Sequence, residues 1–172
     1  VTPDLVCLAK AMGGGVPCGA IGGTLEVMDL IVEGDYEQVG TFNGNPLTMA
    51  AAKAVLTEIL DDSAYLHFDS LREHMVTGVE EAIAEFGLAS HTLAFGAKGC
   101  VVFSPTQARN YRDYLEIEDA YSHLHWLFQH NGGVFLPPWG KSEQWTVSVQ
   151  HTIEDVQRFV DNFHAFARAL SA

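Results

Sequence analysis

The stretch that decides the fold runs from residue 5 to residue 20 and reads LVCLAKAMGGGVPCGA. Its apolar part, Leu5 to Ala9, is bounded by Asp4 and by the glycines, and this pattern predicts a short strand buried on both faces. Lys10 follows at the carboxyl end of that strand, where open α/β folds bind ligands in a crevice. We expect its ammonium to be partly desolvated there, which makes the amine a nucleophile for carbonyl compounds. The alternative is a surface lysine whose stem packs on apolar neighbours while its head stays in water.

A second informative segment covers residues 38–52 and reads QVGTFNGNPLTMAAA. Asn45 and Pro46 are residue types that favour the N-cap and the first position of a helix, which we expect to continue through the alanines to Leu60. Thr41 lies just ahead of this helix start, so its hydroxyl and the nearby N–H groups predict an anion site. The alternative is that Thr41 only caps a turn.

Periodicity and turn residues predict the remaining elements. We expect strands at residues 18–23, 91–95, 99–103 and 145–149, and helices at 25–32 and 118–130. Ser63 is expected to cap a long helix that ends at Gly87 and carries on one face Leu71, Met75, Val79, Ile83 and Phe86. Thr152 and Asp155 bracket the start of the last helix, whose predicted core stripe is Val156, Val160, Phe163, Ala167 and Leu170.

Composition excludes several classes of function. The 172 residues include 22 acidic and 9 basic ones, for a formal net charge of −13. This balance argues against nucleic acid or an anionic membrane as a partner, because both require clustered Lys and Arg. Cys7, Cys18 and Cys100 are an odd number in mostly apolar settings, which predicts buried, reduced thiols and a cytoplasmic protein. We see no leader and no membrane-spanning run, and the histidines lack the spacing of a metal site.

Two motifs together resemble the fold-type I, pyridoxal-phosphate-dependent aminotransferases. The first is Pro3-Asp4-Leu5 followed by Lys10 and the run GGGVPCGA at residues 13–20. The second is Gly40-Thr41-Phe42, then Asn45-Pro46, then an alanine-rich helix. The chain is most similar to the class III group that includes glutamate-1-semialdehyde aminomutase. The resemblance extends through Gly99 and the segments 131–133 and 148–156.

The resemblance implies an α/β fold of the aspartate aminotransferase type. Residues 1–62 would form the C-terminal part of the large domain that binds pyridoxal phosphate. Residues 63–172 would form the small α+β C-terminal domain, including the bridging helix. In this family, the part of the chain before the lysine supplies the aromatic residue that stacks on the cofactor ring, the aspartate that binds the pyridine nitrogen and much of the phosphate site. We therefore expect this chain to be a fragment that is inactive alone.

The resemblance also assigns roles to individual residues. Lys10 matches the lysine that holds pyridoxal phosphate as a Schiff base and moves a proton during the reaction, which makes it the catalytic and cofactor-binding residue. Gly40 and Thr41 match the segment that reaches the cofactor phosphate of the neighbouring subunit, which implies a homodimer with a shared active site. Gly14 and Gly15 would let the backbone pass close to the substrate, although an ordinary turn explains such glycines equally well.

Glu143 is the residue in the sequence that says most about the substrate. It matches the active-site glutamate of the aminomutase-like subgroup, whereas many transaminases of the class carry near here an Arg that binds a substrate carboxylate. This chain has no Arg between Arg112 and Arg158. We therefore expect a carboxylate to face the substrate. A solvated loop glutamate remains the alternative.

The function that follows is amino-group transfer between a small-molecule amino donor and a carbonyl acceptor, with pyridoxal 5'-phosphate on Lys10. The first alternative is an aminomutase of the glutamate-1-semialdehyde type, which moves an amino group between adjacent carbons. The second is a non-catalytic fragment that keeps the scaffold as an interaction module.

Overall fold

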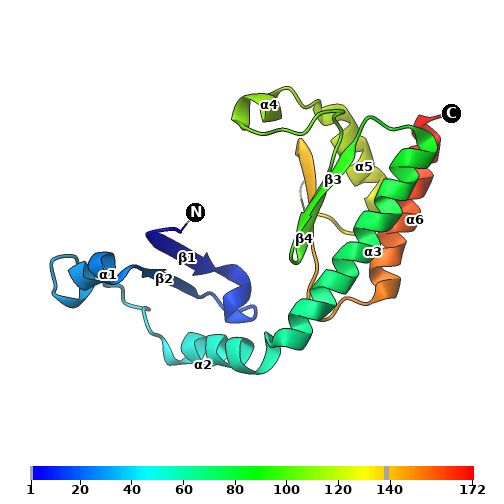
Figure 1. Cartoon of the computed structure of the whole chain (residues 1–172). Helices are drawn as coiled ribbons and strands as arrows, with labels where there is room; N and C mark the ends of the chain where they lie inside the picture. Colours follow the sequence, from blue (N-terminus) through cyan, green and yellow to red (C-terminus); the bar gives the residue numbers. More distant parts are fainter. Residues whose placement is uncertain (1, 138–139) are drawn as a thin grey trace. The chain divides into compact units, whose positions relative to one another are not determined.

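The computed structural model, drawn in Figure 1, describes residues 2–137 and 140–172, with the side chains of residues 142–144 left out. The chain divides into two compact units, the first ending at Asp62 and the second running from Ser63 to Ala172. The first unit contains β1 (Leu5–Ala9), β2 (Gly19–Gly23), α1 (Leu25–Val32) and α2 (Pro46–Ala54).

The two strands of the first unit form an antiparallel pair. Leu5 lies opposite Gly23 and Ala9 lies opposite Gly19. The connection between them begins with a single 3₁₀ turn, Lys10–Gly13. The predicted second strand and the helix at residues 25–32 are confirmed.

Helix α2 begins as the sequence predicts. The Asn45 side chain accepts hydrogen bonds from the backbone N–H groups of Leu47, at 2.9 Å, and Thr48, at 3.4 Å, and Pro46 occupies the first helical position. The helix then continues as a π-helical turn, Val55–Ile59, in place of the expected α-helical end.

The expected burial of β1 is wrong for this chain. All five residues of the strand are exposed, and Leu8 keeps 55% of its surface accessible. The physical reason is that β1 and β2 form a two-stranded ribbon, and two strands alone cannot shield both faces from solvent. Within the described part of this unit, only Gly13 and Ala52 are buried, so the expected burial of Cys7 and Cys18 is wrong as well.

The second unit is built around α3 (Asp62–Phe86), which carries the predicted apolar face. Leu71, Met75, Val79 and Ile83 are buried, and Gly87 follows the last turn with φ of +63°. Because this φ is in the left-handed region, glycine is the favoured residue for ending the helix. Ser63 was expected as the cap, but the helix begins one residue earlier, at Asp62.

A three-stranded antiparallel sheet lies beside this helix. It is ordered β3 (His91–Phe95), β4 (Lys98–Val102) and β5 (Ser142–Thr146). The strand expected at residues 145–149 therefore ends earlier, and Val149 is exposed. Two further helices, α4 (Tyr111–Leu115) and α5 (Asp119–Asn131), connect β4 to β5.

The C-terminal helix α6 (Ile153–Leu170) completes the core. Thr152 and Asp155 form the predicted capping box. Four of its five expected core residues are buried, and Leu170 at the helix end is exposed. Figure 1 shows α6 alongside α3, and the two helices approach closely where a Cβ on Gly78 would lie 2.4 Å from Val160 Cγ1. The apolar faces of both helices are thereby removed from water.

Candidate functional site

Lys10 stands out by its backbone. Its φ is +55°, and it is the one residue other than glycine with positive φ in the part of the chain that the structure describes. The left-handed conformation costs a residue with a side chain about 1–2 kcal/mol. Ala9, directly before it, is fully extended, so the chain turns sharply at the end of β1, and Lys10 is exposed. The expected partial desolvation of its ammonium is therefore wrong for this chain, because the two-stranded ribbon provides no crevice around it. Unusual backbone of this kind is concentrated at functional sites.

The glycines after Lys10 differ in what surrounds them. A Cβ on Gly13 would lie 3.0 Å from Cys18 Cβ, and one on Gly14 would lie 2.7 Å from Val55 Cγ2. A side chain at Gly14 would therefore displace Val55, whereas one at Gly13 would be tight against Cys18. Gly15 has φ of +96° and nothing within 4 Å of its added Cβ, so its backbone borders open space. The roles of Gly14 and Gly15 toward a substrate stay predictions.

Thr41 is exposed in the turn that precedes α2. The carbonyl of Gly40 accepts a hydrogen bond from Asn43 N at 3.0 Å, which closes this turn. A Cβ on Gly40 would lie 2.8 Å from Asn43 Oδ1, the end of an exposed side chain that can swing away. The cofactor role of Gly40 stays a prediction.

The N–H groups at the start of α2 are not available to an anion. Pro46 has no N–H, and those of Leu47 and Thr48 are directed to the Asn45 side chain. The N–H of Met49 bonds to the Asn45 carbonyl at 3.0 Å. The expectation that this helix end donates N–H groups to a phosphate is therefore wrong, because the cap uses them. What remains for an anion is the Thr41 hydroxyl with the backbone of its turn.

Glu143 can be located only by its backbone. It lies in β5, opposite Val101 of β4. Its side chain lies outside what the structure describes, so its predicted contact with the substrate stays a prediction.

Comparison with known proteins decides the family. A family model described as "Aminotransferase class-III" matches residues 1–119. The chain belongs to this family. The glutamate-1-semialdehyde 2,1-aminomutase of Archaeoglobus fulgidus is 35% identical over 163 residues, which cover 94% of this chain and 38% of that protein. The chain thus spans about two fifths of the length of this relative, which agrees with the expectation of a fragment.

Solved structures are similar to this chain in fold. A β-phenylalanine aminotransferase from Variovorax paradoxus is similar with a TM-score of 0.81 at 26% identity, covering 96% of this chain and 38% of that one. A glutamate-1-semialdehyde aminomutase from Pseudomonas aeruginosa shares the fold with a TM-score of 0.85 at 22% identity, covering 99% of this chain and 40% of that one. The predicted fold class, an α/β fragment of the fold of these transaminases, is confirmed.

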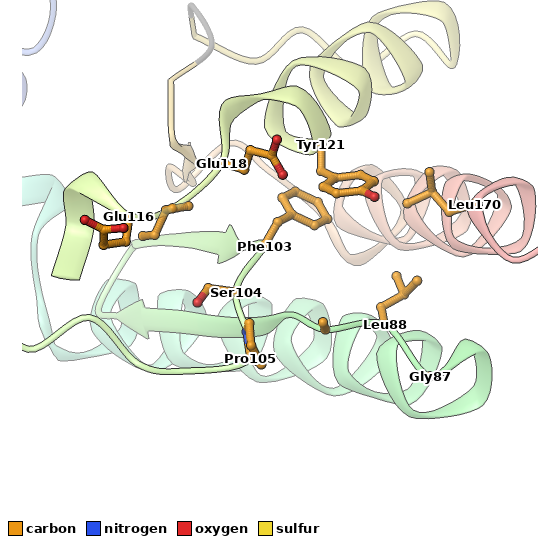
Figure 2. A pocket seen from close by; sticks show the side chains of 11 residues that line it. Gly87, Leu88, Phe103, Ser104, Pro105, Glu116, Glu118, Tyr121 and Leu170 are labelled. Atoms are coloured by element: carbon orange, nitrogen blue, oxygen red, sulfur yellow. The ribbon is translucent and has the colours of Figure 1, made fainter.

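The second unit of this class-III chain contains a hollow that sequence analysis missed. Its volume is about 410 Å³, and Figure 2 shows Phe103, Tyr121 and Leu170 around it, with Glu118 and Ser104 as polar neighbours. None of the residues predicted for the site lines it. Sequence could not reveal it, because its walls come from segments far apart in the chain.

A buried polar cluster in the same unit was also missed. His125 and Gln129 are fully buried on α5, and the Gln129 amide nitrogen lies 3.0 Å from both His125 Nε2 and the Phe159 carbonyl. Asn162 donates to Gln129 Oε1 at 3.1 Å, which fixes the orientation of that amide. Burial lowers the pKa of His125 to about 3. The histidine is therefore a neutral core residue.

Two kinds of feature are absent from the described residues. No group of three or more His, Cys, Asp or Glu side chains there is placed to hold a metal ion. None of the helices described is both long and apolar enough to span a bilayer.

Proposed function

We propose that this chain supplies the cofactor lysine and part of the active site of a pyridoxal-phosphate-dependent enzyme of amino-group transfer. The observation that carries the proposal is Lys10, held with left-handed backbone between the end of β1 and the glycine turn. It lies inside the segment that matches the class-III family. A strained lysine at a strand end is suited to a chemical role, because its conformation brings no gain in stability.

The residues present fit the cofactor. Pyridoxal phosphate has an aldehyde, which the exposed Lys10 amine would hold covalently, and a phosphate, for which Thr41 offers a hydroxyl. When bound, the cofactor supplies an electron sink that makes the neighbouring carbon–hydrogen bond of an amine acidic. Lys10 Nζ, once displaced by the substrate amine, would accept and return the proton at that carbon.

The assembly of the site follows from the same assignment. We assign residues 1–62 to the C-terminal part of the large domain and residues 63–172 to the small domain. Gly40 and Thr41 would serve the phosphate of the neighbouring subunit in a homodimer, so the active site would be shared. We place the protein in the cytoplasm, in keeping with its three free cysteines.

In the proposed reaction, the amino group is either transferred to a second molecule or moved to another carbon of the same molecule. The Archaeoglobus relative named as an aminomutase favours migration, and the Variovorax neighbour named as an aminotransferase favours transfer. Glu143 would attract a substrate ammonium or accept a hydrogen bond from it. Product analysis separates the two reactions, since an aminomutase isomerises its substrate without any added carbonyl acceptor.

The decisive experiment is covalent labelling of the full-length protein that contains this chain. Pyridoxal phosphate is added, the adduct is fixed with borohydride, and the modified residue is identified by mass spectrometry. We expect the label on Lys10, its loss in Lys10→Arg, and no change in Lys53→Arg, which alters an exposed lysine of the same unit. If the label is found on other residues and not on Lys10, or if Lys10→Arg is labelled as fully as the wild type, the proposal is wrong and a non-catalytic scaffold is favoured.

A further inference from the structure

We propose that Val55 is a positioning residue for the cofactor lysine. Its Cγ2 methyl would hold the turn that begins at Lys10 and so maintain the left-handed backbone of that lysine. The inference rests on the proposed function, because it concerns the lysine assigned there. It adds a residue from α2's π-helical extension to a site otherwise built from β1 and its turn.

The contact itself is tight. Gly14 ends the 3₁₀ turn with φ of +60° and donates its N–H to the Ala11 carbonyl at 3.0 Å. A Cβ built on Gly14 would lie only 2.7 Å from Val55 Cγ2. The valine methyl therefore lies directly against the glycine backbone. The turn cannot move in that direction without displacing Val55.

A second wall bounds the same turn. A Cβ on Gly13 would lie 3.0 Å from Cys18 Cβ, and Val16 N bonds to the Gly13 carbonyl at 3.0 Å. The end of the turn is thus bounded at Gly13 by Cys18, which leads into β2, and at Gly14 by Val55. The turn has only four residues. When its end cannot move, the backbone of its first residue, Lys10, can change little either.

The π-helical turn determines where Val55 lies. Val55 is its first residue, and its carbonyl accepts the N–H of Leu60, five residues on, at 2.9 Å. Such turns are rare, are wider than an α-helical turn, and occur frequently at functional sites. The other end of α2 is fixed by the Asn45 cap. A helix anchored in this way can support Val55 against the turn.

Lys10 needs such support because its own conformation is unfavourable. A left-handed residue with a side chain persists only where its surroundings impose it. Without the Val55 contact, we expect the turn to relax and the Lys10 amine to leave its position part of the time. Covalent attachment of the cofactor would then slow, while the sites for the rest of the cofactor would be unaffected.

The test compares Val55→Ala, which removes both γ carbons, with Val55→Thr, which keeps the β-branched shape and puts a hydroxyl of similar size in the place of Cγ2. In the full-length protein, two quantities are measured over a range of pH. One is the rate of pyridoxal phosphate attachment to Lys10, by borohydride quenching and mass spectrometry. The other is the affinity for pyridoxine 5'-phosphate, which has no aldehyde. We expect attachment to slow about tenfold in Val55→Ala, with affinity unchanged and Val55→Thr within about twofold of wild type.

Controls separate positioning from general damage. Leu56→Ala alters the exposed neighbour on the same turn and is expected to attach cofactor at the wild-type rate. Rates are normalised to the folded fraction from circular dichroism. Should Val55→Ala fail to fold, Gly14→Ala strains the same contact from the other side and must also slow attachment.

The outcomes distinguish this inference from the proposed function. Wild-type protein that labels on Lys10, together with a Val55→Ala variant of equal rate, would overturn the positioning role alone. So would a Val55→Thr variant as slow as Val55→Ala. Wild-type protein without label on Lys10 would instead overturn the proposed function, whatever the variants do.

Discussion

The indole of Trp145 lies directly over the backbone of Gly99. The two residues are opposite each other in β5 and β4, and a Cβ on Gly99 would lie 2.3 Å from Trp145 Cζ2. Trp145 is 5% exposed and packs against Phe159 of α6 with ring centroids 5.4 Å apart. Glycine is therefore required at position 99 by an aromatic ring on the neighbouring strand, a pairing that also compensates for the weak strand propensity of glycine.

Gly99→Ala should destabilise the second unit by about 2 kcal/mol, because the rigid indole must shift to admit a methyl group. Urea unfolding followed by tryptophan fluorescence measures this. In a Trp145→Val background the same substitution should cost little, because the ring that obstructs the methyl is gone. Equal costs in both backgrounds would show that the ring is not the obstacle.

Glu80→Ala should destabilise the attachment of β3 to α3 by about 1–2 kcal/mol. Glu80 Oε1 accepts hydrogen bonds from both the backbone N and the hydroxyl of Thr92, each at 2.6 Å. Since β3 is an edge strand, the substitution also leaves an edge amide unpaired. The neighbouring Glu81 is exposed, so Glu81→Ala is the matched control and should be neutral within about 0.5 kcal/mol.

His125 should make the second unit less stable in mild acid. Burial lowers its pKa in the folded chain to about 3, from the ordinary histidine value of 6.5. Below pH 6.5 this histidine is therefore protonated in the unfolded chain but not in the folded one. The free energy of unfolding is highest above that pH and decreases as the pH falls toward 3. Between pH 7 and pH 5 the loss should be about 2 kcal/mol.

Urea unfolding at these two pH values tests the His125 prediction. The variant His125→Gln carries no titrating ring, so its stability should change less with pH than that of the wild type. The difference between the two proteins isolates the buried histidine from the other seven histidines of the chain. The prediction fails if both proteins lose the same free energy.

Thr41→Val should weaken cofactor binding by about tenfold in the full-length protein, because a hydroxyl bonded to a phosphate is replaced by a methyl of equal size. Thr57 is an exposed threonine of the same unit whose hydroxyl bonds to the Lys53 carbonyl at 2.9 Å. Thr57→Val is thus the control and should leave affinity unchanged. Titration with pyridoxal phosphate, monitored by absorbance, gives both values, and equal affinities for the two variants would remove Thr41 from the site.

Hydrogen exchange should differ sharply between the units of the isolated chain. Apolar side chains of the first unit remain exposed, including Leu5, Leu8 and Phe42, whereas the second has a core of buried apolar residues from α3, the sheet and α6. We expect fast amide exchange up to Asp62 and protection from Leu71 onward in α3. Mass spectrometry of peptides measures this, and equal protection in both units would contradict it.

Local signals in the sequence located most elements. Asn45 before Pro46, the pair Thr152 and Asp155, and Gly87 after a long apolar stripe gave helix ends within one or two residues. These signals work because a cap satisfies backbone groups of its own helix and needs no distant partner. The same local logic misjudged the start of α2 as an anion site, since one cap residue already occupies the donors.

The sequence by itself determined the family, the position of the candidate lysine and the helix boundaries, because motifs and caps are read from neighbouring residues. Only the tertiary structure decided that β1 is exposed, that Gly14 lies against Val55 and that Gly99 lies under Trp145. The last two facts are contacts between residues more than forty positions apart. Hydrophobic packing is non-directional and follows the shape of the whole fold, so no local pattern records which distant side chain occupies a given space.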